Sequence, residues 1–353
     1  MKTIWFADIR QTKLYSFSPQ VEAVMRACVL ANQVGCPLFI SSLTSSMASD
    51  IVKKRKVKGC VVAGEVTSAS LACDGSNYWN KCWRHAAGFV CSPPLREGEM
   101  DELVDATADG SIDVVSSHHA AYNTQQKALG KGHFSNIPSG ITGIEERLLV
   151  LWQKAVQPGK MTRSQFVKVT SAAAARLLNI YPQKGCLAVG SDADIVIWDP
   201  AKTKTITKEE HLSKCDFNIF EGLEINGGPE YVIFKGKVVK DQDVFRPMTG
   251  YGQYQPLPPY TPYMYDKIRE KNEKAKIEPV ARSEQDMATI NGIENIPPPT
   301  PEALICPNNQ QRSSVDLNSH PQTPDFDSAS HSPGRSSVRV RAPPGGNTSG
   351  GFW

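Results

Sequence analysis

Two adjacent histidines are the first candidates for chemistry in this chain. His118 and His119 follow a short apolar run that predicts a strand. Imidazole nitrogens are common transition-metal ligands. Neighbouring residues of a strand point to opposite faces, however, so two adjacent histidines do not easily chelate one ion. We therefore expect both rings to pack against protein rather than to form a new metal site.

A cysteine and a histidine three residues apart are a second candidate. Cys82 and His85 would form a nucleophile and its base if their side chains met. Trp79, Trp83 and Phe89 lie close by in the sequence. This apolar spacing is more typical of an amphipathic helical segment that packs in the core than of a Cys–His dyad.

Composition limits the classes of function. The 353 residues are 40% hydrophobic and 21% charged, with a formal net charge of +3, so bulk electrostatics gives no reason to expect nucleic-acid binding. The sequence contains no apolar run of the ~18 residues that a membrane span needs, and its start lacks the apolar core of a signal peptide. The nine cysteines are widely spaced without a Cys-x-x-Cys pair, which predicts reduced thiols. We expect a cytoplasmic protein.

The elements that position these residues alternate over the first half of the chain. Apolar spacing predicts helices at 21–31, 48–56, 99–108, 143–155 and 162–180, and short apolar runs predict strands at 37–40, 59–63 and 113–117. Thr162 is placed to cap the last helix. This alternation indicates an α/β fold with parallel strands joined by crossover helices.

From Gly185 onward the pattern is that of a small β module followed by a tail. Apolar runs at 195–198, 231–234 and 237–239 are separated by turns, and Lys235-Gly236 between the last two predicts a hairpin. Residues 297–353 hold few aliphatic residues, too few to offset the entropy lost on ordering. We divide the chain into an α/β part (1–184), a β segment (185–265) and a mostly disordered Pro/Ser-rich tail (266–353).

Several sequence blocks, taken in order, resemble one enzyme group. They are 69–71 with 74–79, then 126–131, 137–140 and 143–147, then 185–200. Together they are similar to the dihydropyrimidinase and hydantoinase branch of the amidohydrolases, over roughly residues 15–270. The resemblance implies a TIM-like (β/α)₈ barrel, of which this chain would hold the later strands, with residues 185–265 forming part of a small β-sandwich and returning to the barrel. The family's earlier half, with its His-x-His metal pair and bridging carboxylated lysine, would precede Met1, and no His-x-His occurs here.

The same resemblance implies that the catalytic centre is degenerate. The family opens a cyclic imide with water activated by two metal ions. Ser42 stands where the family has a metal-binding histidine, and His118 stands where it has the catalytic aspartate. Ser139 replaces a substrate-binding asparagine, whereas Ser70 keeps a substrate-binding serine. A hydroxyl is a poor ligand for zinc, and a histidine cannot supply a negative charge, so we expect the binuclear zinc site to be lost and no cofactor to be bound.

Further segments are similar to the collapsin response mediator proteins, the branch that lost these ligands. They are Phe89–Leu95 with its Ser-Pro-Pro-Leu, 117–119, 217–222 and 341–346. This resemblance implies a non-catalytic protein that forms homo- or hetero-tetramers with related chains, binds tubulin and microtubules, and acts in axon growth.

The tail contains a pattern typical of regulation by protein kinases. Thr300, Thr323 and Ser332 each precede a proline, while Ser319 and Ser328 lie four residues before the last two of these sites. This spacing suits a priming kinase followed by a second kinase that recognises the primed phosphate. Such sites also occur by chance in any Pro/Ser-rich tail. We take all five as candidate phosphorylation sites.

Two other hypotheses remain open at this point. The chain could be a dihydropyrimidinase-type hydrolase that needs an N-terminal half, although added sequence would not restore the ligands at Ser42 and His118. It could also be a non-functional fragment, because half a barrel exposes unpaired strand edges.

Overall fold

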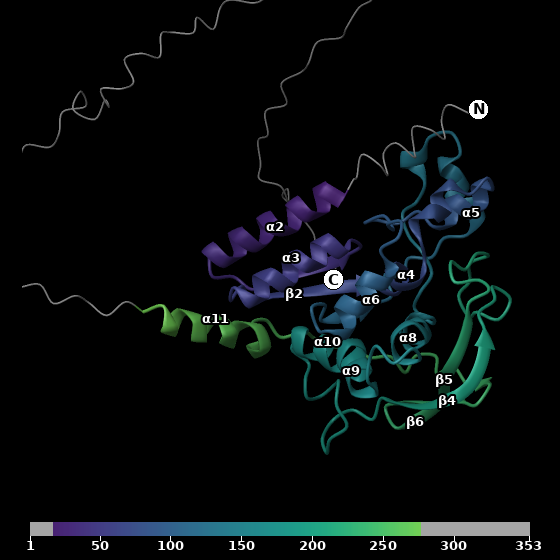
Figure 1. Cartoon of the computed structure of the whole chain (residues 1–353). Helices are drawn as coiled ribbons and strands as arrows, with labels where there is room; N and C mark the ends of the chain where they lie inside the picture. The colour runs from purple at the N-terminus through teal and green to yellow at the C-terminus, as the bar shows by residue number, and fades with distance from the viewer. Residues whose placement is uncertain (1–16, 277–353) are drawn as a thin grey trace, which may run out of the picture. The chain divides into compact units, whose positions relative to one another are not determined.

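A three-stranded parallel sheet forms the first part of the structure, a computed structural model that describes residues 17–276 (Figure 1). The strands β1 (Leu38–Leu43), β2 (Val62–Thr67) and β3 (Val114–Ser116) lie in the order β1-β2-β3. The register pairs Phe39 with Ala63 and Val66 with Val115. Parallel neighbours require crossover connections, which the helices between the strands supply.

The helices around this sheet follow the predicted pattern, with one shifted strand. The helices α2 (Phe17–Gln33), α3 (Ser46–Val57) and α6 (Met100–Ala108) fall where apolar spacing placed them. The second strand was predicted at 59–63, and that prediction was wrong at both ends. Gly59 has a φ of +76° and its amide donates to the carbonyl of Lys56 at 2.9 Å, so Gly59 belongs to the turn that follows α3 and the strand begins only at Val62.

Short helices line the connections after β2 and β3. They are α4 (Ser68–Ala72), η1 (Gly75–Trp79), α5 (Trp83–Gly88), α7 (Thr124–Lys127), η2 (Ala128–Gly130) and η3 (Phe134–Asn136). All of them follow the carboxyl end of a strand in the chain. This is the end of a parallel sheet at which barrel enzymes place their functional residues.

Two longer helical runs join the sheet to the β module. The first consists of α8 (Arg147–Leu151) and the π-helical η4 (Trp152–Val156), and the second of α9 (Arg163–Val167), η5 (Lys168–Ala172) and α10 (Ala173–Leu177). The predicted cap is confirmed, because the Thr162 hydroxyl accepts a hydrogen bond from the amide of Gln165 in a capping box.

The β module is a four-stranded antiparallel sheet. Its strands β4 (Ile195–Thr205), β5 (Glu224–Phe234), β6 (Lys237–Asp241) and β7 (Val244–Phe245) follow each other in chain order. The predicted hairpin between β5 and β6 is confirmed, and Lys235 and Gly236 both have positive φ angles, of 47° and 78°. These angles are those of the two-residue turn that fits the twist of paired strands.

One hydrophobic core extends from the parallel sheet to the antiparallel sheet. Buried side chains of β2 and β3, such as Val66 and Val115, belong to the same cluster as Trp152 and Ile225. α8 contacts both β3 and β5, and Figure 1 shows this helix between the two sheets. The α/β part and the β module therefore fold around one shared core.

A helix that the sequence did not predict covers the amino end of the parallel sheet. α11 (Pro262–Lys274) buries Met264 and Ile268 against Val61 and Ala63. The expected start of the tail at residue 266 falls inside this helix and was therefore too early. The rest of the predicted tail, from residue 277, lies outside the described residues. Within residues 17–276, no helix has the length and apolar character needed to cross a membrane.

Candidate functional site

The carboxyl end of the parallel sheet gathers the residues that the sequence marked as degenerate. Ser42 lies near the end of β1, Ser70 lies in α4 directly after β2, and His118 follows β3. Because carboxyl ends of parallel strands meet at one edge, these three residues share one end of the sheet. Ser139 lies two residues before Ile141. Ile141 pairs with His119 in a short parallel bridge, and its carbonyl accepts a hydrogen bond from the amide of Ala120 at 2.9 Å.

Ser42 is bonded to a carboxylate that the sequence analysis did not single out. Glu65 on β2 accepts hydrogen bonds at Oε1 from Ser41 and Ser42 of β1, at 3.0 and 3.1 Å, and from Ser116 of β3, at 2.7 Å. Ser42 is only 3% exposed. Hydroxyl–carboxylate bonds are charge-assisted and stronger than neutral ones. A single acidic residue inside an apolar strand was the sequence signal that could have identified Glu65.

His118 and His119 lie beyond the strand and point to different neighbours. β3 ends at Ser116, and His118 has a φ of +50°, so the predicted strand alternation does not apply to this pair. The Nε2 atom of His118 lies 2.9 Å from the carbonyl oxygen of Ser92. The Nδ1 atom of His119 accepts the amide of Ile144 at 3.4 Å. The two rings therefore do not converge on one point.

Ser70 and Ser139, which the resemblance led us to expect at substrate-pocket positions, differ in their surroundings. Ser70 is 4% exposed, its hydroxyl lies 2.9 Å from that of Thr67, and its amide donates to the Thr67 hydroxyl at 3.1 Å. The bond from the Ser70 amide to the Thr67 hydroxyl caps the first turn of α4. Ser139, in contrast, is exposed. The Ser70 hydroxyl is therefore bonded inside the protein, whereas the Ser139 side chain is open to solvent.

A buried lysine holds the loops around this end together. Lys127 is 3% exposed, and its ammonium group donates to the carbonyls of Val90, Pro138 and Gly140 at 3.0, 2.7 and 2.8 Å. Burial lowers the pKa of Lys127 to about 8. The sequence analysis quoted this residue only as part of a family block, and nothing in its neighbours marked it as buried.

Cys82 and His85 do not form a dyad. The Nε2 atom of His85 lies 2.9 Å from Oδ1 of Asn77, and its ring packs on Phe89 with centroids 4.9 Å apart. Burial lowers the pKa of His85. The prediction of core packing holds only in part for His85, which is half-buried against Phe89, and is wrong for Cys82, which is exposed.

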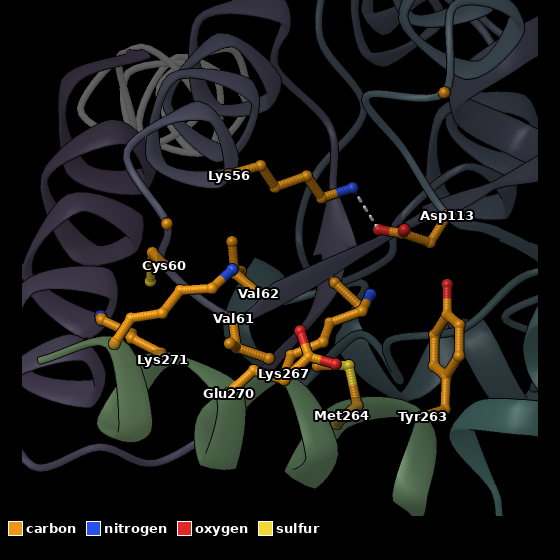
Figure 2. A pocket seen from close by; sticks show the side chains of 14 residues that line it. Lys56, Cys60, Val61, Val62, Asp113, Tyr263, Met264, Lys267, Glu270 and Lys271 are labelled. Carbon is orange, nitrogen blue, oxygen red and sulfur yellow. Dashed lines mark hydrogen bonds and ion pairs between the residues drawn. The ribbon is translucent and has the colours of Figure 1, made fainter.

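A pocket of about 510 Å³ lies at the opposite, amino end of the sheet (Figure 2). One wall is α11, and the other walls are the end of α3 and the starts of β2 and β3. Its charged lining residues are Lys56, Asp113, Lys267, Glu270, Lys271 and Lys274. Lys56 is paired with Asp113 at 2.6 Å. The remaining four groups all belong to α11.

The sequence of this chain matches a known protein family. Residues 27–239 match the model of the amidohydrolase family. The chain belongs to the amidohydrolase family. Rat dihydropyrimidinase is 42% identical over 266 residues, which are 75% of this chain and 51% of that protein. Human dihydropyrimidinase-related protein 5 is 35% identical over 343 residues, which are 94% of this chain and 60% of that protein.

Solved amidohydrolase structures confirm the predicted fold class. A D-hydantoinase from Thermus sp. superposes with a TM-score of 0.65 at 34% identity, covering 69% of this chain and 53% of that one. A dihydropyrimidinase from Brevibacillus agri gives 0.62 at 36% identity, with 64% and 49% covered. The chain spans about half the length of the curated relatives it matches. The predicted resemblance to dihydropyrimidinases and to the collapsin response mediator proteins, which are also called dihydropyrimidinase-related proteins, is therefore confirmed.

The residues at the carboxyl end do not fit the binuclear metal centre of catalytic amidohydrolases. The Ser42 hydroxyl is bonded to Glu65, and the His118 ring faces the Ser92 carbonyl. Within residues 17–276, no three His, Cys, Asp or Glu side chains lie close enough together to hold a metal ion. The five candidate phosphorylation sites, from Thr300 to Ser332, lie outside the described residues.

Proposed function

We propose that this amidohydrolase-family chain is a pseudoenzyme that acts as a cytoplasmic adaptor for tubulin and microtubules in neuronal growth and axon guidance. The observation that supports the loss of catalysis is the bond from Ser42 to Glu65. A serine hydroxyl that donates to a carboxylate is not a ligand for zinc, and the same carboxylate joins β1, β2 and β3. The polar groups at this end stabilise the sheet.

The extent of similarity favours the mediator branch over the enzymes. The alignment with dihydropyrimidinase-related protein 5 covers 94% of the chain, whereas that with rat dihydropyrimidinase covers 75%. The additional similarity must therefore include residues outside the part matched by the enzyme. This agrees with a tail that mediator proteins have and the enzymes lack. On this basis we also expect homo- or hetero-tetramers with related chains, which light scattering would measure.

A hydrolase of the dihydropyrimidinase type is the second candidate. It is favoured by the higher identity to rat dihydropyrimidinase, 42% against 35%, and by the retained Ser70. Purified protein is assayed for opening of dihydrouracil and hydantoin with added zinc or manganese. We expect no turnover above a metal-only blank and well below two metal ions per chain by mass spectrometry. Turnover above the blank would make the chain an enzyme.

Tail phosphorylation is proposed as the switch of tubulin binding. Phosphates at Ser319, Thr323, Ser328 and Ser332 would each add about −1.5 to −2 charge beside Arg335 and other tail arginines. Tubulin surfaces are acidic, so we expect the phosphorylated tail to be repelled, and less so at high salt because exposed charges are screened over ~8 Å.

Co-sedimentation with microtubules tests this proposal. A variant with Glu at those four serine and threonine positions is compared with wild type at low and high salt, and a variant with Gln at the same positions serves as the uncharged control. We expect weaker binding of the Glu variant alone, most clearly at low salt. Equal binding of all three proteins would exclude the tail as the switch, whereas the absence of any binding would contradict the adaptor function itself.

A further inference from the structure

The pocket at the amino end of the parallel sheet has buried apolar side chains at its base and charged side chains on the wall formed by α11. Met264 and Ile268 fix α11 against Val61 and Ala63, so the position of the helix does not depend on its charged residues. Lys267, Lys271 and Lys274 follow at spacings of four and three residues and line the pocket. On an α-helix such positions lie on one face, and the three lysines therefore form one stripe.

The charges of this stripe are not neutralised by the pocket itself. Four lysines and two carboxylates line it, and Lys56 is already paired with Asp113. Among the remaining groups, Glu270 is the only carboxylate beside the three lysines of α11. Lys267 lies over the Tyr263 ring at 4.4 Å, and Lys271 bonds the side-chain oxygen of Asn32; neither partner is a carboxylate. Figure 2 shows Lys267 and Glu270 rising from α11 toward the Lys56–Asp113 pair.

From this arrangement we infer that the pocket binds a small multivalent anion, one that presents two or more phosphate or carboxylate groups. Its volume of about 510 Å³ is within the range of small-molecule sites. The stripe from Lys267 to Lys274 extends ~10 Å along the helix, which is longer than one tetrahedral anion. Lysine ammonium groups bind phosphates and carboxylates as point charges without a fixed geometry.

A nucleic acid fits this pocket less well than a small anion. Single strands are bound through aromatic side chains on which bases stack. Tyr263 is the aromatic residue of the lining, and its ring is covered by Lys267. The inference does not depend on the tubulin adaptor function, because it concerns a different ligand and a different end of the sheet from the degenerate catalytic centre.

Titration calorimetry of the full chain with sodium tripolyphosphate and with citrate tests the proposal. We expect binding that weakens with added salt. The variant Lys267→Gln/Lys271→Gln/Lys274→Gln should bind both anions at least about tenfold more weakly. Glu270→Gln should bind about twofold to fivefold more tightly, because it removes the like charge from the stripe. These changes of opposite sign are not expected from a loss of folding.

The matched control removes three exposed lysines elsewhere, in Lys81→Gln/Lys131→Gln/Lys214→Gln. It should bind both anions as wild type does. An equal loss of affinity in this control would show that the weaker binding of the stripe variant follows from net charge alone, and would overturn the proposal. If orthophosphate binds as tightly as tripolyphosphate, the inference that the ligand is multivalent is wrong. Tighter binding of a hexaglutamate peptide or of single-stranded DNA would replace the small anion by a macromolecular partner.

Discussion

At the carboxyl end of the parallel sheet Glu65 and Lys127 are each bonded to three protein groups, whereas at the amino end several lysine ammonium groups without a carboxylate partner among the described residues line a pocket. Glu65 accepts three hydroxyl hydrogen bonds, and Lys127 donates to three carbonyls. At the amino end, Lys267, Lys271 and Lys274 line a pocket in which Glu270 is the one lining carboxylate from the same helix. In a parallel sheet of this family the carboxyl end is where chemistry is expected. We expect the bonds at the carboxyl end to stabilise the fold, and we have proposed the lysines at the opposite end as an anion site.

Replacement of Lys127 should have the largest effect on the free energy of unfolding. Lys127→Met keeps much of the side-chain volume but leaves three carbonyls without their donor. Each unsatisfied buried group costs about 1 kcal/mol or more, so we expect a loss of about 3 kcal/mol in urea unfolding. Lys131→Met, at an exposed position close by in the sequence, is the control and should change stability by less than about 0.5 kcal/mol. Similar values for both variants would show that the three carbonyls do not depend on Lys127.

The free energy of unfolding of the wild type relative to Lys127→Met should also depend on pH, by a smaller amount. Burial lowers the pKa of Lys127 from 10.5 to about 8. Between these values the unfolded chain holds the proton that the folded chain has released, so stability rises with pH in this window. We expect the wild type to gain about 2 kcal/mol relative to Lys127→Met from pH 8 to pH 10. A constant difference would indicate that the carbonyl bonds offset the cost of burying the charge.

Glu65→Gln should destabilise the protein by about 1–2 kcal/mol, because neutral hydrogen bonds replace charge-assisted ones. Thermal unfolding measured with the protein at fixed concentration and pH 7 checks this value. Glu224→Gln changes an exposed carboxylate on β5 and serves as the matched control. If the two variants unfold at the same temperature, the three serine bonds do not stabilise the sheet.

The smallest effect is expected at the amino end. The stripe variant Lys267→Gln/Lys271→Gln/Lys274→Gln should change the free energy of unfolding by less than about 0.5 kcal/mol, because substitutions of surface residues outside the core are usually tolerated. The buried anchors Met264 and Ile268 stay in place. A loss comparable to that of Lys127→Met would contradict the contrast between the two ends, since these lysines would then stabilise α11.

Local patterns predicted most of the elements but not their ends. Helix spacing located α2, α3 and α6, and the turn residues Lys235 and Gly236 located the hairpin. The shifted second strand shows the limit, because the mostly apolar run from Gly59 to Ala63 was taken as the strand, whereas Gly59 has a positive φ in the turn after α3 and the strand begins only at Val62. α11 was missed since its mostly charged sequence shows only two buried apolar residues, and its stability comes from packing on β2.

The sequence by itself determined the family and suggested Ser42 and His118 as positions that differ from the metal-binding residues of catalytic amidohydrolases. Side-chain types such as those of Ser42 and His118 decide ligand chemistry wherever they lie, and they can be identified without coordinates. Only the tertiary structure decided what these positions do instead. The bonds from Glu65 to two other strands, and from Lys127 to Val90, join residues distant in the chain. Strand register and loop packing bring these groups within hydrogen-bond distance, and no local sequence pattern specifies such pairs.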